Sequence, residues 1–172
     1  IHCVGREEKG YCSKVCCLYS IKFAHHLKDM VLQTEVFEFY SDLCLPDKTD
    51  QDYLEEAKKK GIHFIRAGGV EIKKNGGKIS IKHKNSQGET SHVSVDMVVL
   101  APALIPSEDT PKLANIFNIP LDETGFFKEA HEKLNPVSTP IEGIFIVGCA
   151  SGPKNISESV IQSQAASGKI LS

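Results

Sequence analysis

The side chains with the greatest capacity for chemistry are the cysteines, and they are unevenly distributed. Four of the six lie within the first 17 residues, in the pattern C-x8-C-x3-C-C formed by Cys3, Cys12, Cys16 and Cys17. Four thiolates suit either tetrahedral zinc or an iron–sulfur cluster. Because no secretory signal precedes them, the clustering points to metal or redox chemistry in a reducing, cytoplasmic compartment rather than to disulfides.

The elements expected around these cysteines would bring them together. Residues 1–5 are predicted to form a short buried strand, and a helical pattern of apolar residues follows Ser13, which we expect to be the N-cap. A helix starting there places Cys12 and Cys16 on one face of its first turn. Cys3 would arrive from the end of the adjacent strand. The unpaired N–H groups of the helix N-terminus would donate to sulfur.

Two other interpretations of the cysteines remain open. Structural zinc sites usually carry paired C-x2-4-C spacings, and neither that spacing nor a paired histidine occurs here. The cysteines could also be buried small apolar side chains, although four cysteines within 15 residues make this the weaker interpretation. Cys44 is assigned no role.

The glycine motif of a dinucleotide-binding domain is missing where it would be expected. In that motif, G-x-G-x-x-G follows the first strand and lets the helix N-terminus approach a pyrophosphate. Here the stretch CVGREEKGYCSKVCC contains only Gly5 and Gly10, with Arg6, Glu7 and Glu8 between them. We therefore expect neither NADH nor NADPH to bind at this turn.

The remaining pattern predicts an α/β protein, Rossmann-like with a β-meander. The domain assigned to residues 1–105 carries the cysteine cluster, and residues 106–172 form a second, C-terminal segment. The expected strands and helices occupy residues 30–40, 50–60, 62–67, 71–73, 78–84, 93–101, 111–117 and 143–148, with a last helix from about residue 156.

Charge and hydropathy exclude two classes of partner. The 20 Lys and Arg residues against 22 Asp and Glu leave a formal charge of −2, which does not favour nucleic acid or an anionic membrane. No apolar run approaches the roughly 20 residues of a membrane span, so we expect no direct membrane insertion. The chain starts without Met on a predicted strand, and we interpret it as a piece of a longer protein.

The sequence resembles the A-type subunit of heterodisulfide reductase, which is the flavin and iron–sulfur component of that enzyme in methanogens and related anaerobes. Three stretches carry the resemblance: CVGREEKGYCSKVCCLYSIKFA, DMVVLAPALIP and GFFKEAHEKLNPVSTPIEGIFIVGCASGPKNISESVIQSQAAS. The resemblance implies a thioredoxin-reductase-like core whose nicotinamide domain has lost its nucleotide motif. It implies that this domain carries a 4Fe–4S cluster on Cys3, Cys12, Cys16 and Cys17.

The resemblance also implies that FAD binds the C-terminal segment in the full-length protein. The matching turn contributes these cofactor-binding candidates: Gly148, Cys149, Pro153, Lys154, Asn155 and Ile156. Related reductases have Gly-Asp where this chain has Gly148-Cys149. We therefore expect backbone N–H groups to contact the FAD in place of the Asp carboxylate. Cys149 is expected to pack beside the flavin rather than to bind the cluster. The N-terminal half of the FAD domain is absent from this chain.

By the same resemblance, the function is electron transfer in CoB–CoM heterodisulfide reduction with flavin-based bifurcation. The implied partners are the B-type and C-type subunits of heterodisulfide reductase and a hydrogenase or similar electron donor, with a homodimer as a further expectation. Two alternatives are a related component of a quinone-interacting membrane-bound oxidoreductase complex and a zinc-stabilised interaction domain.

Overall fold

The chain divides into two compact units, which are described separately. The structure is a computed structural model that describes residues 1–85 and 87–171. Unit 1 comprises Ile1–Ala103 and unit 2 comprises Leu104–Ser172. The predicted boundary lies two residues further along, after residue 105. The assignment of the units to a Rossmann-like and an FAD-binding domain stays a prediction.

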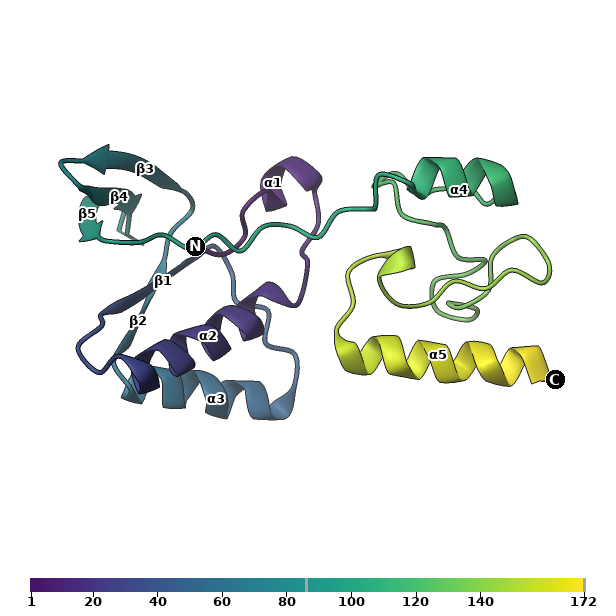
Figure 1. Cartoon of the computed structure of the whole chain (residues 1–172), viewed down its shortest axis with the longest axis horizontal. Coiled ribbons are helices and arrows are strands. Elements are labelled where there is room, and N and C mark those ends of the chain that lie inside the picture. The colour runs from purple at the N-terminus through teal and green to yellow at the C-terminus, as the bar shows by residue number, and fades with distance from the viewer. Residues whose placement is uncertain (86, 172) are drawn as a thin grey trace. The chain divides into compact units, whose positions relative to one another are not determined.

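Unit 1 combines a parallel pair of strands, an antiparallel sheet and three helices (Figure 1). Its elements in chain order are α1 (Arg6–Lys9), α2 (Cys16–Met30), β1 (Val36–Tyr40), α3 (Lys48–Lys59), β2 (Ile62–Arg66), β3 (Val70–Asn75), β4 (Lys78–Lys84) and β5 (Thr90–Val95). β1 pairs in parallel with β2, and β4 lies between β3 and β5 in the antiparallel sheet.

Residues 1–4 run alongside β1 without forming a regular strand. The His2 N–H donates to the Phe39 carbonyl oxygen at 2.8 Å, and on the other side the Val4 N–H donates to the Ala101 carbonyl oxygen at 3.3 Å. Cys3 interrupts the extended backbone because its φ of 57° is left-handed. The predicted strand at residues 1–5 is therefore reduced to a single bridge, Val4 with Pro102.

The apolar run at the end of unit 1 also differs from its prediction. Residues 93–101 were expected to form one strand buried on both faces, but β5 ends at Val95 and no strand is assigned to 96–101. Met97 is 76% exposed and Val99 is 69% exposed, whereas Ala101 is buried. Continuous apolar sequence thus did not specify burial here, because burial depends on which elements cover the segment.

Helices α2 and α3 lie side by side and pack on the parallel strands (Figure 1). Their core contains Ile21 and Ala24 from α2, Leu54 and Ala57 from α3, and Ile62 from β2. Helix α3 begins with a capping box in which Asp47 and Asp50 bond each other's backbone N–H groups. It ends before Gly61, whose φ is 78°.

The start of α2 corrects one prediction about the cysteines. The helix begins at Cys16, and Val15 rather than Ser13 is at the N-cap position. Lys14 has a left-handed φ of 61°, which is incompatible with a helix running from Ser13. Cys12 consequently precedes the helix and does not share a helical face with Cys16.

The predicted hairpin is confirmed in the antiparallel sheet. Asn75 pairs with Lys78, which leaves a two-residue connection of Gly76 and Gly77. Both glycines have positive φ, 56° and 93°, as a type I′ turn requires. The sheet places its buried residue Ile81 against Phe39 of β1.

Unit 2 contains α4 (Thr110–Phe117), a 3-10 turn η1 (Gly148–Ser151) and α5 (Ile156–Leu171). The predicted strand at residues 143–148 appears only as a bridge between Ser138 and Phe145. Val137 and Ile146 are buried there, and the Ile146 N–H donates to the Val137 carbonyl oxygen at 2.9 Å. Within residues 1–85 and 87–171, no helix has the length and apolar character needed to cross a membrane.

Candidate functional site

Three of the four clustered cysteines surround one small cavity in unit 1. Cys3, Cys12 and Cys16 line it together with Ser13, Arg6 and the segment 101–103. The cavity encloses about 10 Å³, at most the space of a single water molecule. Thiols separated by up to 13 positions are therefore gathered by the tertiary structure.

Cys16 and Cys17 form the buried end of this group. They are 4% and 1% exposed and lie in the first turn of α2. The hydrogen bond with Cys17 outweighs burial and, with a smaller electrostatic effect of His2, lowers the pKa of the Cys16 thiol to about 6. The same hydrogen bond and burial raise the pKa of Cys17. The pair thus favours a Cys16 thiolate that accepts a hydrogen bond from the Cys17 thiol.

Cys12 is held by its own loop, directly before α2. Its sulfur accepts a hydrogen bond from the Lys14 N–H at 3.3 Å. The left-handed Lys14 backbone makes this return contact possible. The local turn, rather than a helical face, directs Cys12 toward the other thiols.

Cys44 joins the group, although its place in the sequence gave no sign of this. It lies on the loop after β1 and packs against Cys16 and Cys17. Its backbone N–H donates to the Cys17 sulfur at 3.4 Å. Burial, and next the neighbouring Cys12, raise the pKa of the Cys44 thiol. Unit 1 therefore contains a group of five thiols, which we call the cysteine cluster: Cys3, Cys12, Cys16, Cys17 and Cys44.

The donor chemistry of the cysteine cluster fits a soft metal or an iron–sulfur cofactor. Across residues 1–85 and 87–171, however, no group of three or more Cys, His, Asp or Glu side chains is arranged to hold a metal ion. Cys3, Cys12 and Cys16 line the small cavity without forming such a site. The structure thus brings cysteines close together in unit 1, while their assignment as cluster ligands stays a prediction.

A buried pair of ionisable side chains lies beside the cysteine cluster. His2 and Glu38 are 4% and 7% exposed, and the His2 Nε2 atom contacts a Glu38 carboxylate oxygen. The His2 Nδ1 atom is buried with no hydrogen-bond partner among the described residues. This pair fixes residue 2 on β1 and therefore fixes the chain direction at Cys3.

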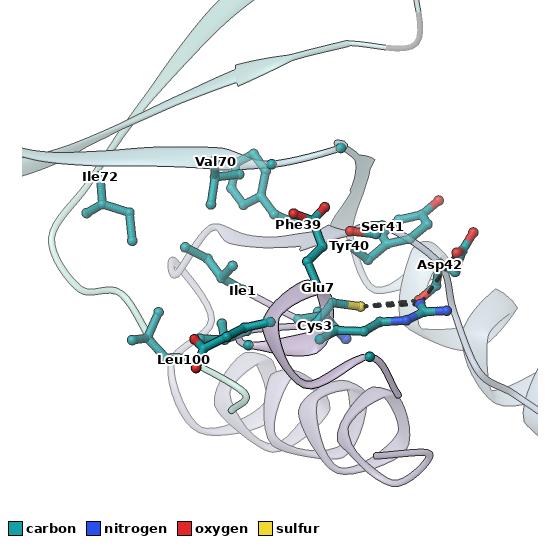
Figure 2. Close-up of a pocket in the computed structure, with 18 residues that line it drawn as sticks. Ile1, Cys3, Glu7, Phe39, Tyr40, Ser41, Asp42, Val70, Ile72 and Leu100 are labelled. Carbon is teal, nitrogen blue, oxygen red and sulfur yellow. Dashed lines mark hydrogen bonds and ion pairs between the residues drawn. The ribbon is translucent and has the colours of Figure 1, made fainter. Parts of the chain in front are cut away.

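Cys3 also lines a wider cleft of about 770 Å³. It is lined by the first residues of the chain, by the C-terminal end of β1 and by the segment 68–72, and the C-terminal ends of strands are where open α/β sheets bind ligands. Figure 2 shows Glu7 entering this cleft, in place of the glycines that a pyrophosphate would need. Glu7 and Glu8, which line the cleft, favour the prediction that no nicotinamide cofactor binds here. That absence stays a prediction.

Arg6 connects the cleft to the cysteine cluster. Its Nη1 atom lies 4.0 Å from the Cys3 sulfur and 3.4 Å from the Asp42 Oδ2 atom. The hydrogen bond to Cys3 raises the pKa of the Arg6 guanidinium. The Asp42 backbone carbonyl lies 3.8 Å from the Cys3 sulfur (Figure 2). The same carbonyl lies 3.9 Å from the Cys17 sulfur. Sequence reasoning treated Arg6 only as an obstacle to a dinucleotide and did not single out Asp42.

The predicted FAD turn is ordered by contacts within unit 2. Gly148 is buried with a φ of 60°, and its N–H donates to the Gln162 Oε1 atom at 2.8 Å. Lys154 donates to the Ser151 Oγ atom at 3.0 Å. Pro153 is half-buried, whereas the exposed Cys149 directs its sulfur to the Lys154 carbonyl oxygen at 3.6 Å.

The start of α5 is closed by a reciprocal pair of hydrogen bonds. The Asn155 side chain accepts the Glu158 N–H at 2.7 Å, and the Glu158 carboxylate accepts the Asn155 N–H at 2.8 Å. Ile156, 85% exposed, follows directly as the first helical residue. Asn155 therefore caps the helix, and the N–H groups of residues 156 and 157 remain as candidates to face an anionic cofactor.

Comparison with known proteins identifies relatives along almost the entire chain. A protein of Archaeoglobus profundus, named as similar to the A-type subunit of heterodisulfide reductase, is 39% identical over 178 aligned residues, covering 100% of this chain and 25% of that protein. The first of two A-type iron-sulfur subunits of the CoB–CoM heterodisulfide reductase of Methanopyrus kandleri is 39% identical, covering 96% of this chain and 27% of that protein. The chain thus spans about a quarter of the length of these relatives. No family model matches it.

Solved structures give the fold. Thioredoxin reductase of Lactococcus lactis superposes on 86% of this chain and 47% of its own, with a TM-score of 0.58 and 24% identity. This similarity confirms the predicted α/β fold of the flavoprotein reductases. Over nearly its whole length, this chain is therefore homologous to one quarter of the A-type subunit of heterodisulfide reductase, as its sequence resemblance indicated.

Proposed function

We propose that this chain is part of the FAD and iron–sulfur electron-transfer subunit, the A-type component, of a heterodisulfide reductase, an oxidoreductase acting on the CoB–CoM heterodisulfide. The observation that carries the proposal is the convergence of Cys3, Cys12 and Cys16 on one cavity at the start of α2. The thiols gather where other α/β reductases have a nucleotide-binding turn. The name of the Methanopyrus relative, an iron-sulfur subunit, supports the same cofactor class.

In this proposal Cys3, Cys12, Cys16 and Cys17 hold a 4Fe–4S cluster, which supplies one-electron transfer when bound. The ionised Cys16 is ready to bind metal because only the thiolate is a ligand. The Cys44 N–H stabilises negative charge on Cys17 through its hydrogen bond. Burial and Cys12 raise the pKa of Cys44, just as the Cys16 hydrogen bond and burial raise that of Cys17, so iron content in variants must separate these two thiols.

FAD would lie against the turn from Gly148 to Ile156 in the full-length protein. The capped start of α5 offers backbone N–H groups there, and Lys154 offers a positive charge held by Ser151. The chain's contribution is to orient the cofactors and set their electrostatic surroundings, while the cofactors carry the redox chemistry. As one component of a complex, the protein would work with further subunits, for which the B-type and C-type subunits and a hydrogenase-type donor are the candidates.

Anaerobic reconstitution with iron and sulfide tests the cluster. We expect about four irons and four sulfides per chain and an EPR signal after reduction. Cys12→Ser and Cys16→Ser should lose the cluster. Cys149→Ser, in unit 2, is the matched control and should retain it. Zinc without sulfide in the purified protein would contradict the proposal and favour the zinc-stabilised interaction domain.

Cys44→Ser separates the two possible ligand sets. If the first four cysteines are the ligands, this variant should keep its full iron content, because its backbone N–H to Cys17 is unchanged. Loss of iron from Cys44→Ser together with retention in Cys12→Ser would exchange these two residues in the ligand set.

A further inference from the structure

Arg6 is a cationic side chain that contacts a sulfur of the cysteine cluster and also lines the cleft. Its guanidinium lies 4.0 Å from the Cys3 sulfur. Its side chain is 35% exposed, so solvent screens it less than a freely extended arginine. A cation at this distance stabilises whichever state of the sulfur ligand carries more negative charge.

Asp42 holds Arg6 in this position. The two side chains are joined at 3.4 Å, from Arg6 Nη1 to Asp42 Oδ2. The other Asp42 oxygen accepts Arg66 Nη2 at 2.9 Å, and Arg66 Nε also donates to the Ser41 carbonyl oxygen at 3.1 Å. Asp42 is thus shared by two arginines. Of these two arginines, Arg6 alone contacts a cysteine among the residues that the structure describes.

We propose that Arg6 raises the reduction potential of the cluster. Asp42 is the positioning residue, because it directs the Arg6 guanidinium at the Cys3 sulfur. The inference rests on the proposed cluster with Cys3 as a ligand. Reduction adds negative charge to the thiolate-bound cofactor, and a nearby cation together with N–H···S contacts favours that state. In this proposal, Arg6 stabilises the reduced cluster from a turn where a dinucleotide-binding protein would have glycine.

Arg66 provides a matched control. Arg6→Gln and Arg66→Gln each remove one positive charge and one partner of the same carboxylate, but only the first removes the contact with Cys3. Arg6→Lys keeps the charge and removes the planar fork. A general charge effect would act in both glutamine variants, whereas a directed effect would act in one.

The experiment is an anaerobic redox titration of the reconstituted full-length protein, followed by the EPR signal of the cluster assigned to these cysteines. In Arg6→Gln we expect the ratio of reduced to oxidised cluster at a fixed potential to fall about tenfold, or 59 mV for a one-electron couple. Arg66→Gln should change it less than threefold, and Arg6→Lys should lie between them.

The outcomes distinguish the inference from the proposed function. A full-length wild-type protein that reconstitutes without a cluster on these cysteines would overturn both. A cluster whose potential shifts equally in Arg6→Gln and Arg66→Gln, or does not shift in Arg6→Gln, would overturn only the role of Arg6. If Arg6→Gln does not retain iron, Arg6→Met, which also removes the charge, is titrated in its place: a potential equal to the wild type would refute the role of Arg6.

Discussion

Replacing Ile21 by alanine tests whether α2 is anchored as described, and so whether the structure positions Cys16 and Cys17 correctly. Ile21 is 0% exposed and lies in the core formed by α2, α3 and β2. Truncation removes three carbons, worth about 2.4 kcal/mol of lost burial at about 0.8 kcal/mol for each. The cavity left behind adds to this cost, so we expect unit 1 to lose about 3–4 kcal/mol of its free energy of unfolding.

Leu27→Ala is the control on the same helix. Leu27 is 43% exposed, so its truncation loses only part of the same burial and leaves no closed cavity. We expect a loss of about 1–1.5 kcal/mol from the buried portion of the side chain. The comparison between the two variants cancels their similar effects on helix propensity.

Urea unfolding followed by tyrosine fluorescence measures this difference in unit 1 alone. The protein has no tryptophan, and its four tyrosines, Tyr11, Tyr19, Tyr40 and Tyr53, all lie within Ile1–Ala103. The midpoint concentration should fall with an unchanged m value. Equal losses in Ile21→Ala and Leu27→Ala, or losses below about 1 kcal/mol in both, would show that α2 does not pack on α3 through Ile21.

Four further predictions concern cofactors and protonation. Calorimetric titration of NADH or NADPH should give no binding tighter than about 100 μM, close to −5.5 kcal/mol, because Glu7 and Glu8 stand at the turn; tighter binding would contradict this. In the full-length protein, Lys154→Met should lower the flavin reduction potential by some tens of millivolts, since about 30 mV corresponds to 1.4 kcal/mol for two electrons. An unchanged potential would show that Lys154 does not act on the flavin. This chain alone should purify without stoichiometric FAD. A yellow, FAD-replete preparation would refute the proposal that FAD binding also needs residues of the full-length protein outside this chain. In cluster-free protein, thiolate absorbance near 240 nm should rise with a midpoint near pH 6, because the Cys17 hydrogen bond lowers the pKa of Cys16 from 9.0 to about 6. This step should vanish in Cys16→Ser. A first rise in absorbance above pH 8 would contradict the prediction.

Local chemistry in the sequence determined several elements correctly. The hairpin at Gly76-Gly77 follows from two residues that both adopt positive φ at low cost. Helix α3 follows from its periodic surface pattern and ends before Gly61. The unusual cysteine spacing and the missing glycines likewise needed no structure, because they depend only on residue type and order. These features led to the correct family resemblance.

Only the tertiary structure decided which side chains meet. Cys44 is 27 residues from Cys17, and no local period links them; the loop after β1 brings its N–H to that sulfur. The same loop places Asp42 beside Arg6, a contact across 36 positions. Backbone conformation at Cys3 and Lys14 moved the strand end and the helix start away from their expected positions. Local spacing specifies the elements, but contacts between loops at the ends of strands depend on how those elements pack, and the environment of the cysteines is set there.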